Sequence, residues 1–282
     1  MSENREDLLA RLQERAAAVR EGVMVALNAA GSGHVGGSLS IADVLTALYF
    51  HTMRYDPKNP RWPDRDRLVL SKGHANAALT PVLAEAGFYD KELVKTFNHL
   101  DSPFGMHPDM RKIPGCDMST GALGHGLAVG VGMALAARLQ RKDFRVYVIM
   151  GDGELNEGSN WESAMAGAHW GLDRLVGIVD RNRFCLGSAT EDTMSLEPLA
   201  AKWQAFGWAV REIDGNDFAQ VVDALDAVPF VEGKPSLILA HTVKGKGFSQ
   251  AEDRCDWHYA TVTDEILHAA QAEMRSAAGK RS

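Results

Sequence analysis

The stretch that decides the fold covers residues 146–182 and reads VYVIMGDGELNEGSNWESAMAGAHWGLDRLVGIVDRN. Residues 146–150 and 175–179 are short apolar runs rich in β-branched side chains, which is typical of strands buried on both faces. Residues 161–170 between them have helical spacing and stop at Gly171. A strand, a helix and a second strand in this order predict one βαβ unit of a parallel sheet.

The rest of the chain continues this alternation of helices and short strands. Helices are predicted at residues 4–30, 40–49, 76–86, 126–139, 196–206, 217–227 and 264–274, and further strands at 67–70, 208–213 and 236–240. Ser40 followed by Asp43 is interpreted as a capping box that opens the second helix. The pattern predicts a single α/β domain over residues 1–282, doubly wound, with a mainly parallel sheet and helices on both faces.

Composition and charge exclude several classes of protein. The 282 residues are 45% hydrophobic and carry a formal net charge of −7, without a long run of Lys or Arg. We therefore expect no nucleic-acid partner and no anionic membrane surface. The 3 cysteines form no CxxC pair, which excludes a zinc ribbon or a disulfide framework and favours a cytoplasmic location.

Two segments bear on membrane targeting. The N-terminal sequence MSENREDLLARLQER is charged throughout and lacks the apolar core of a signal peptide. Residues 118–137 carry no formal charge, but they contain His125 and several glycines. Their continuous apolar part is shorter than the roughly 20 residues that a membrane span needs. A buried helix and a soluble protein are predicted.

Two polar residues directly follow the predicted strands of the βαβ unit. Asp152 comes after the first strand and Asn182 after the second, and ligands of open α/β sheets bind at these carboxyl ends. One carboxylate, one amide oxygen and a loop carbonyl suit Mg²⁺ or Ca²⁺ that also binds phosphate oxygens. Gly153 allows the backbone to approach those phosphates. The alternative is an ordinary Asp-Gly turn, with Asn182 in a second turn.

Two glycine patterns resemble a dinucleotide fingerprint, which requires a strand before the glycines and a helix after them. Gly31, Gly33 and Gly36 follow a predicted helix instead. The second pattern, at residues 124–130, follows MSTGAL, which is a poor strand sequence. Close helix packing and tight turns are the favoured interpretation, and NAD binding is disfavoured.

Four histidines, His34, His74, His107 and His125, lie in glycine-bearing loops. Together they predict a polar pocket for an oxygen-rich substrate or a phosphate. No pair has the i, i+4 spacing of helical zinc ligands. Four further histidines, at residues 51, 99, 169 and 268, are interpreted as structural or surface residues.

Five ordered motifs then identify a family. They are GSGHVGGSLS, LVLSKGHA, MHPDMRKIPGCDMSTGALGHGL, GDGELNEGSNWESAMAGA and IVDRN. From about Asn28 to Asn182 the chain resembles the N-terminal half of transketolases, and most closely the separate N-terminal subunit of two-chain transketolases. The resemblance continues more loosely through HTVKGKGF to WHYATVT.

This resemblance implies a thiamine-diphosphate enzyme and makes the chain its diphosphate-binding domain. It implies Mg²⁺ as the metal, with Ca²⁺ or Mn²⁺ as alternatives. The implied metal ligands are Asp152, Asn182 and the backbone carbonyl of Phe184; the implied cofactor contacts are His74, Gly121, Leu123, Gly153, Glu157 and Asn182; the implied catalytic histidines are His34, His74, His107 and His258.

The sequence also departs from the family's usual pattern. Val35 stands where proline is common, and residues 184–187 read FCLG where many members have QxDG. His241 replaces a lysine that often opens the late KTxxGxG motif. These departures bear on loop closure and substrate preference rather than on cofactor binding. For Cys185, beside the metal loop, packing is favoured over reactivity.

The expected reaction is the transfer of a two-carbon ketol unit from a ketose, or its phosphate, to an aldose or its phosphate. The pyrimidine domain of the family is expected on a separate C-terminal subunit, in a heterotetramer of two plus two chains. Two alternatives remain. One is a subunit of a related enzyme, 1-deoxyxylulose-5-phosphate synthase-like or dehydrogenase-type. The other is a non-catalytic cofactor-binding protein, which the retained Asp152, Asn182 and histidines argue against.

Overall fold

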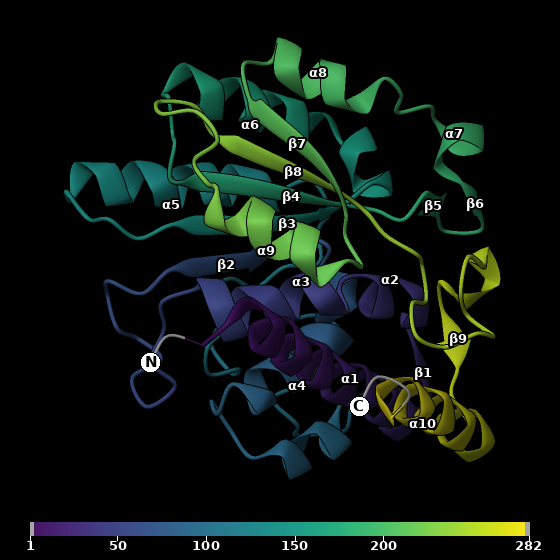
Figure 1. Cartoon of the computed structure of the whole chain (residues 1–282). Coiled ribbons are helices and arrows are strands. Elements are labelled where there is room, and N and C mark those ends of the chain that lie inside the picture. Colours follow the sequence, from purple (N-terminus) through teal and green to yellow (C-terminus); the bar gives the residue numbers. More distant parts are fainter. Residues whose placement is uncertain (1–2, 280–282) are drawn as a thin grey trace.

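A five-stranded parallel sheet forms the centre of the computed structural model, which describes residues 3–279. The predicted domain also includes residues 1–2 and 280–282, which lie outside the described residues. The strands are β2 (Arg67–Leu70), β3 (Val146–Gly151), β4 (Leu175–Arg181), β8 (Ser236–His241) and β7 (Ala209–Asp214), in this spatial order. Every neighbouring pair is parallel, so all carboxyl ends lie at one edge, on the right in Figure 1.

Side chains alternate between two apolar cores on the two faces of the sheet. Tyr147 and Ile149 of β3 lie in one core, and Val146 and Val148 lie in the other. The helices on the side of the first face are α1 (Arg5–Ala29), α2 (Val35–Ser40), α3 (Ala42–Ala47), α4 (Asn76–Glu85), α9 (Phe218–Asp226) and α10 (Asp264–Gly279), of which α10 packs on α1 (Figure 1). The second face is covered by α5 (Gly126–Leu139), α6 (Gly158–His169) and α8 (Leu199–Ala205). The doubly wound α/β prediction is confirmed.

Short elements connect these layers, several of them at the carboxyl edge of the sheet. Two antiparallel ribbons are present, β1 (Ser32–Gly33) with β9 (Ala260–Thr261) and β5 (Phe184–Cys185) with β6 (Ser188–Ala189). The others are a π-helical turn at Leu48–Thr52, 3₁₀ turns at Gly73–Ala75, Lys91–Thr96, Gly153–Asn156 and Cys255–Trp257, and the short helix α7 (Thr190–Thr193). The β1–β9 ribbon joins the loop after α1 to the segment before α10 (Figure 1).

The capping-box prediction at Ser40 and Asp43 is wrong. Ser40 is the last residue of α2, and α3 begins at Ala42. The Ser40 hydroxyl is fully buried and donates to the Asp180 carboxylate at 2.7 Å. A long-range hydrogen bond to a buried charge has taken the side chain that a local cap would use.

Helix α5 forms where a buried helix was predicted for the uncharged stretch, but only one of its faces is buried, against the sheet. A Cβ added to Gly130 would come within 2.4 Å of Val148 Cγ2, so glycine permits the close approach of α5 to β3. Ala128 and Gly132 on the opposite side are exposed. Within residues 3–279, none of the helices combines the length and the apolar character needed to cross a membrane.

Candidate functional site

The three predicted cation ligands lie together where β3 and β4 end. Asp152 directly follows β3 and Asn182 directly follows β4. The Arg183 N–H donates to Asp152 Oδ2 at 2.6 Å, and the Phe184 N–H donates to Asn182 Oδ1 at 3.1 Å. Asp152 is 1% exposed and Asn182 is 6% exposed. The loop after β4 therefore folds back over both side chains.

The oxygen donors at this position fit a divalent cation. Burial, followed by the neighbouring Asp180 charge, raises the pKa of Asp152 to about 6. A bound cation would favour the ionised carboxylate, because an opposite charge stabilises it. Asp152 already accepts from the Gly153 N–H at 2.8 Å and from Arg181 Nη1 at 3.1 Å, which fixes its orientation. A carboxylate, an amide oxygen and a backbone carbonyl form a hard donor set.

Gly153 is required by a close contact with the following loop. A Cβ at this position would lie 2.8 Å from Cys185 Sγ. Burial raises the pKa of the Cys185 thiol, with the Asp152 charge as the next cause, so the thiolate is disfavoured. Cys185 therefore packs against the turn that holds Asp152.

Asp180 and Lys72 form a buried ion pair beneath these ligands, and neither residue was among those predicted from the sequence. Asp180 accepts from Lys72, from the Ser40 and Thr242 hydroxyls, and from Asn182 Nδ2 at 3.0 Å. Because Nδ2 faces Asp180, Asn182 Oδ1 faces away and remains available as a ligand. A carboxylate within the apolar run LVGIVD was the available signal, since a buried charge needs a partner.

Four of the predicted site histidines form one cluster. Ring centroids of His34 lie 5.0 Å from His74, 5.4 Å from His258 and 6.5 Å from His107. His34 precedes α2, His74 is in a 3₁₀ turn, and His258 follows the last 3₁₀ turn. The β1–β9 ribbon brings His258 to His34 from the other end of the chain.

Burial keeps three of these imidazoles neutral. Burial, followed by the charge of His107, lowers the pKa of His34 to about 4, and burial with Lys244 lowers that of His258 to about 4. For His74, burial and the charge of Lys72 lower the pKa to about 2. A neutral imidazole has one donor and one acceptor nitrogen. His34 Nδ1 is buried without a partner in residues 3–279, so a polar ligand would satisfy it.

Lys244 connects the histidine cluster to the cation ligands. Its Nζ lies 3.4 Å from His258 Nδ1 and 5.4 Å from the centre of the Phe184 ring. The side chain is buried, and burial together with Lys72 lowers its pKa to about 8. Lys244 was not predicted as a site residue, although its place at the start of KGKG, directly before Gly245, was a signal.

The predicted cofactor loop lies along the same edge of the sheet. A Cβ on Gly121 would lie 3.1 Å from the His107 ring. The next turn is held by the Gly124 N–H, which donates to Glu154 Oε1 at 2.9 Å. Glu157 is exposed next to Gly124, at the start of α6, and Leu123 is half-buried. These residues therefore extend the site toward α6.

His125 does not join the histidine cluster. It is exposed, and its Nδ1 pairs with the Leu123 carbonyl at 3.1 Å. The expected grouping thus holds for His34, His74 and His107 and is wrong for His125. All four were predicted in one pocket because each lies in a glycine-bearing loop. Such a loop does not determine the direction in which the histidine side chain points.

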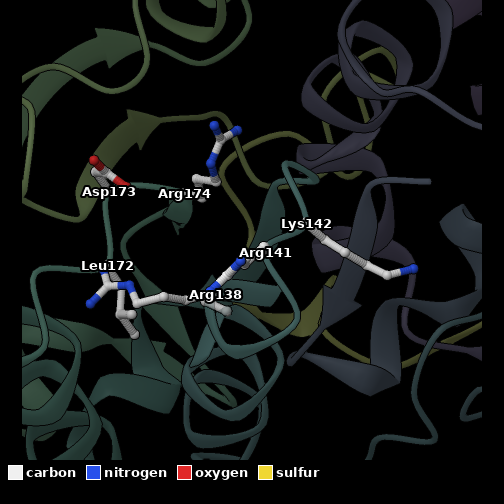
Figure 2. Close-up of a pocket in the computed structure, with 7 residues that line it drawn as sticks. Arg138, Arg141, Lys142, Leu172, Asp173 and Arg174 are labelled. Atoms are coloured by element: carbon white, nitrogen blue, oxygen red, sulfur yellow. The ribbon is translucent and has the colours of Figure 1, made fainter. Parts of the chain in front are cut away.

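A basic pocket of about 230 Å³ lies at the opposite, amino-terminal end of β3 and β4. It is lined by Ala134, Arg138, Arg141, Lys142, Leu172, Asp173 and Arg174. Figure 2 shows Arg138 reaching toward Leu172 while Lys142 extends in the other direction. Arg138 donates to the Gly171 carbonyl at 2.6 Å, and Lys142 pairs with Asp64 at 2.8 Å. These cations fasten loops, and none of the predicted site residues lines the pocket.

Comparison with known protein families shows which proteins this chain is similar to. Residues 12–278 match the family model described as transketolase, thiamine diphosphate binding domain. The chain is 44% identical to a 6-deoxy-6-sulfo-D-fructose transketolase subunit of a Clostridium species (strain MSTE9), over 97% of this chain and 98% of that protein. It is 45% identical to an apulose-4-phosphate transketolase subunit of Phocaeicola vulgatus, over 87% of each chain.

Solved structures agree with these relatives. Transketolase from Campylobacter jejuni superposes with a TM-score of 0.88 and 32% sequence identity, over 96% of this chain and 45% of that chain. A mutant transketolase from Pichia stipitis also gives a TM-score of 0.88, with 31% identity over 93% of this chain and 40% of that one. The chain thus spans less than half the length of these solved proteins.

Proposed function

Because the chain belongs to the transketolase family, a family of transferases, we propose that it is the diphosphate-binding subunit of a two-chain transketolase. In this proposal it transfers a two-carbon ketol unit from a ketose to an aldose. One observation carries the proposal: the candidate cation ligands and the histidine cluster share one edge of the sheet, connected through Lys244. The chain and its subunit relatives also correspond over nearly their whole length.

Asp152, Asn182 and the Phe184 carbonyl are proposed to hold Mg²⁺, and through it the diphosphate. When bound, thiamine diphosphate supplies the nucleophilic carbon for attack on the ketose carbonyl. His74, Gly121, Leu123, Gly153, Glu157 and Asn182 are the proposed cofactor contacts. The buried position of Asp152 and Asn182 supports this assignment, because low exposure strengthens the electrostatic attraction of a cation.

His34, His107 and His258, beside His74, are proposed to bind the sugar. Neutral imidazoles can accept a hydroxyl proton at one nitrogen and donate to an oxygen at the other. The low pKa values of His34 and His258 leave them neutral at physiological pH, so each offers one hydrogen-bond donor and one acceptor to the sugar. The unpartnered Nδ1 of His34 supports a ligand at this position.

A partner subunit that carries the pyrimidine domain is proposed to complete the active site. The relatives from the Clostridium species and P. vulgatus are both named as subunits. Glu157 supports an interface, because this carboxylate is exposed at the start of α6, at the rim of the site. In this proposal the whole chain is one diphosphate-binding domain, and the assembly contains two copies of each chain.

The donor is proposed to be a ketose that carries an anionic group. The two relatives are named for a sulfo-fructose and for apulose 4-phosphate, which share that feature. A cytoplasmic location is also proposed, on the basis of three cysteines that are all free thiols.

The decisive experiment compares the chain alone with the chain co-purified with its partner. Both are assayed with Mg²⁺, thiamine diphosphate, xylulose 5-phosphate and ribose 5-phosphate, and then with a panel of anionic ketoses. The assembled enzyme should transfer ketol units and the isolated chain should not. Turnover by the isolated chain would overturn the partner requirement. A cofactor-loaded assembly that transfers no ketol unit from any donor would overturn the proposed reaction.

A further inference from the structure

Tyr259 occupies a fixed position against His34, at the exposed edge of the histidine cluster. Its ring meets His34 edge-on, with centroids 5.0 Å apart and an interplanar angle of 89°. Its hydroxyl lies 3.1 Å from the Ser32 hydroxyl. Although the ring contacts His34 and the hydroxyl contacts Ser32, 51% of Tyr259 remains exposed to solvent. An aromatic residue that is held in place and yet exposed is available to contact a ligand.

The backbone around this tyrosine is held by regular pairing. Ser32 is paired with Thr261 in the β1–β9 ribbon, and the Val262 N–H donates to the Gly31 carbonyl at 3.0 Å. Asn28 Nδ2 also donates to the Val262 carbonyl at 3.1 Å. Ser32 lies in this ribbon and Tyr259 directly precedes its second strand. Because the ribbon is attached to the end of α1, both hydroxyls have a defined position beside His34.

The Ser32–Tyr259 pair has hydrogen-bonding capacity to spare. Two hydroxyl groups carry two donors, and their mutual hydrogen bond uses only one of them. Neither hydroxyl makes another hydrogen bond within the described part of the chain. One donor and several lone pairs therefore remain available to a ligand.

The buried imidazoles of the cluster beside this pair are uncharged at neutral pH. His34 and His258 are neutral, and Lys72 and Lys244, whose charges help to lower the pKa of these histidines, are each only 1% exposed. Hydroxyls and neutral imidazoles favour a neutral hydroxyl group as ligand, whereas an anion is bound best by exposed cations or charge-assisted donors. The Ser32–Tyr259 hydroxyls and the neutral imidazoles beside them are therefore suited to bind the polyol part of a sugar.

We propose that the Ser32–Tyr259 hydroxyl pair is a specificity-determining element that binds a sugar hydroxyl outside the transferred two-carbon unit. The inference rests on the proposed function, because it requires a sugar beside His34. It also assigns the anionic group of the substrate to a different part of the assembled site. The Tyr259 ring, packed edge-on against His34, additionally restricts the orientation of that imidazole.

The test uses the assembled holoenzyme with the variants Tyr259→Phe and Ser32→Ala. Tyr259→Phe keeps the ring on His34 and removes only the hydroxyl. Tyr55→Phe is the matched control, since this tyrosine packs in a separate aromatic cluster with Tyr49 and Phe88. Donors are the best ketose of the panel and hydroxypyruvate, whose only hydroxyl lies on the transferred unit. Melting temperatures confirm that each variant is folded.

Both site variants should raise KM for the ketose about two- to tenfold, the effect of one neutral hydrogen bond, while kcat changes little. KM for hydroxypyruvate should stay at the wild-type value, as should all constants of Tyr55→Phe. An equal rise for both donors would indicate a merely structural role and overturn the inference, as would a Tyr259→Phe enzyme that matches wild type with the ketose.

A binding measurement keeps the inference separate from the proposed reaction. Calorimetry with ribose 5-phosphate reports the affinity of the holoenzyme for a sugar even if no ketol transfer occurs. Tyr259→Phe should weaken this binding about two- to tenfold. If wild type binds the sugar but shows no transfer, only the reaction fails. If Tyr259→Phe binds it as tightly as wild type, or wild type does not bind it, the Tyr259 assignment fails.

Discussion

Asp180 organises the candidate site at the scale of single residues. Its buried carboxylate accepts hydrogen bonds from groups on four different segments, those of Ser40, Lys72, Asn182 and Thr242. These bonds compensate for the loss of hydration, and the pKa of Asp180 is lowered by Lys72 in spite of burial. One carboxylate thus joins α2, the turn after β2, the end of β4 and the end of β8.

Asp152→Asn tests the cation site with minimal change of shape. The amide keeps the size of the side chain and removes the negative charge, so affinity for Mg²⁺ and thiamine diphosphate in the assembled enzyme should fall at least about tenfold. Titration calorimetry measures the loss. Asp192→Asn is the matched control, because Asp192 is exposed in α7 and has no hydrogen bond or ion pair in residues 3–279. Equal cofactor affinity of Asp152→Asn and wild type would refute the ligand assignment.

The neutral histidines predict a loss of stability in acid. The pKa of His34 and that of His258 fall from 6.5 to about 4 on folding, so below pH 6.5 the unfolded chain binds protons that the folded chain does not. Stability should therefore be fully present above about pH 6.5 and decrease as pH falls toward 4. The facing groups, His74, His107, Lys72 and Lys244, are all bases and add to the cost of a new positive charge.

Urea unfolding of the full chain at several pH values between 7 and 4.5 measures this effect. Each such histidine contributes a slope of up to about 1.4 kcal/mol per pH unit. His34→Gln removes one of them, so its free energy of unfolding should depend less steeply on pH than that of wild type. His169→Gln, at an exposed position in α6, serves as control. Identical slopes for wild type and His34→Gln would contradict the assigned pKa.

At the scale of elements, α5 shows how two glycines in one helix have opposite roles. Gly130 faces β3, where an added Cβ would meet Val148 at 2.4 Å, whereas a Cβ on Gly132 would meet nothing within 4 Å. The sequence pattern alone does not separate them, because both lie in the same uncharged helical run. The distinction arises from the direction in which each glycine faces.

Alanine at these two positions should therefore change stability in opposite directions. Gly130→Ala should lower the free energy of unfolding by about 1–3 kcal/mol, because a β-branched side chain in a packed strand cannot move aside freely. Gly132→Ala should raise it by about 0.5–1 kcal/mol, because alanine favours the helix over the unfolded chain. Denaturant titration of both variants tests the pair. A stabilising Gly130→Ala would show that α5 does not approach the sheet so closely.

At the scale of the whole molecule, the residues that pack the two cores lie apart from the residues of the candidate site. Apolar side chains fill both faces of the sheet, while the candidate ligands and histidines collect at its carboxyl edge. The exposed Glu157 and His107 lie on the open side of that edge. This is the surface on which the proposed partner subunit would complete the site.

Native mass spectrometry of the co-purified enzyme should give a mass for two copies of each chain. If both chains contribute to one cofactor site, cofactor binding stabilises the assembly and the assembly stabilises cofactor binding. The fraction of cofactor retained and the fraction of assembled enzyme should therefore rise together as the partner is added. Cofactor retention that is independent of partner concentration would contradict a shared site. An assembly with one copy of each chain would refute the two-plus-two arrangement.

The sequence alone determined the parallel sheet, its two covered faces, and the positions of Asp152 and Asn182. These features follow from local periodicity and from the rule that polar residues after buried strands meet at one edge. Only the tertiary structure decided that Tyr259 meets His34, that Lys72 pairs with Asp180, and that Ser40 binds this carboxylate instead of capping a helix. These contacts join residues far apart in the chain, so their energies depend on burial and side-chain direction, which no local pattern contains.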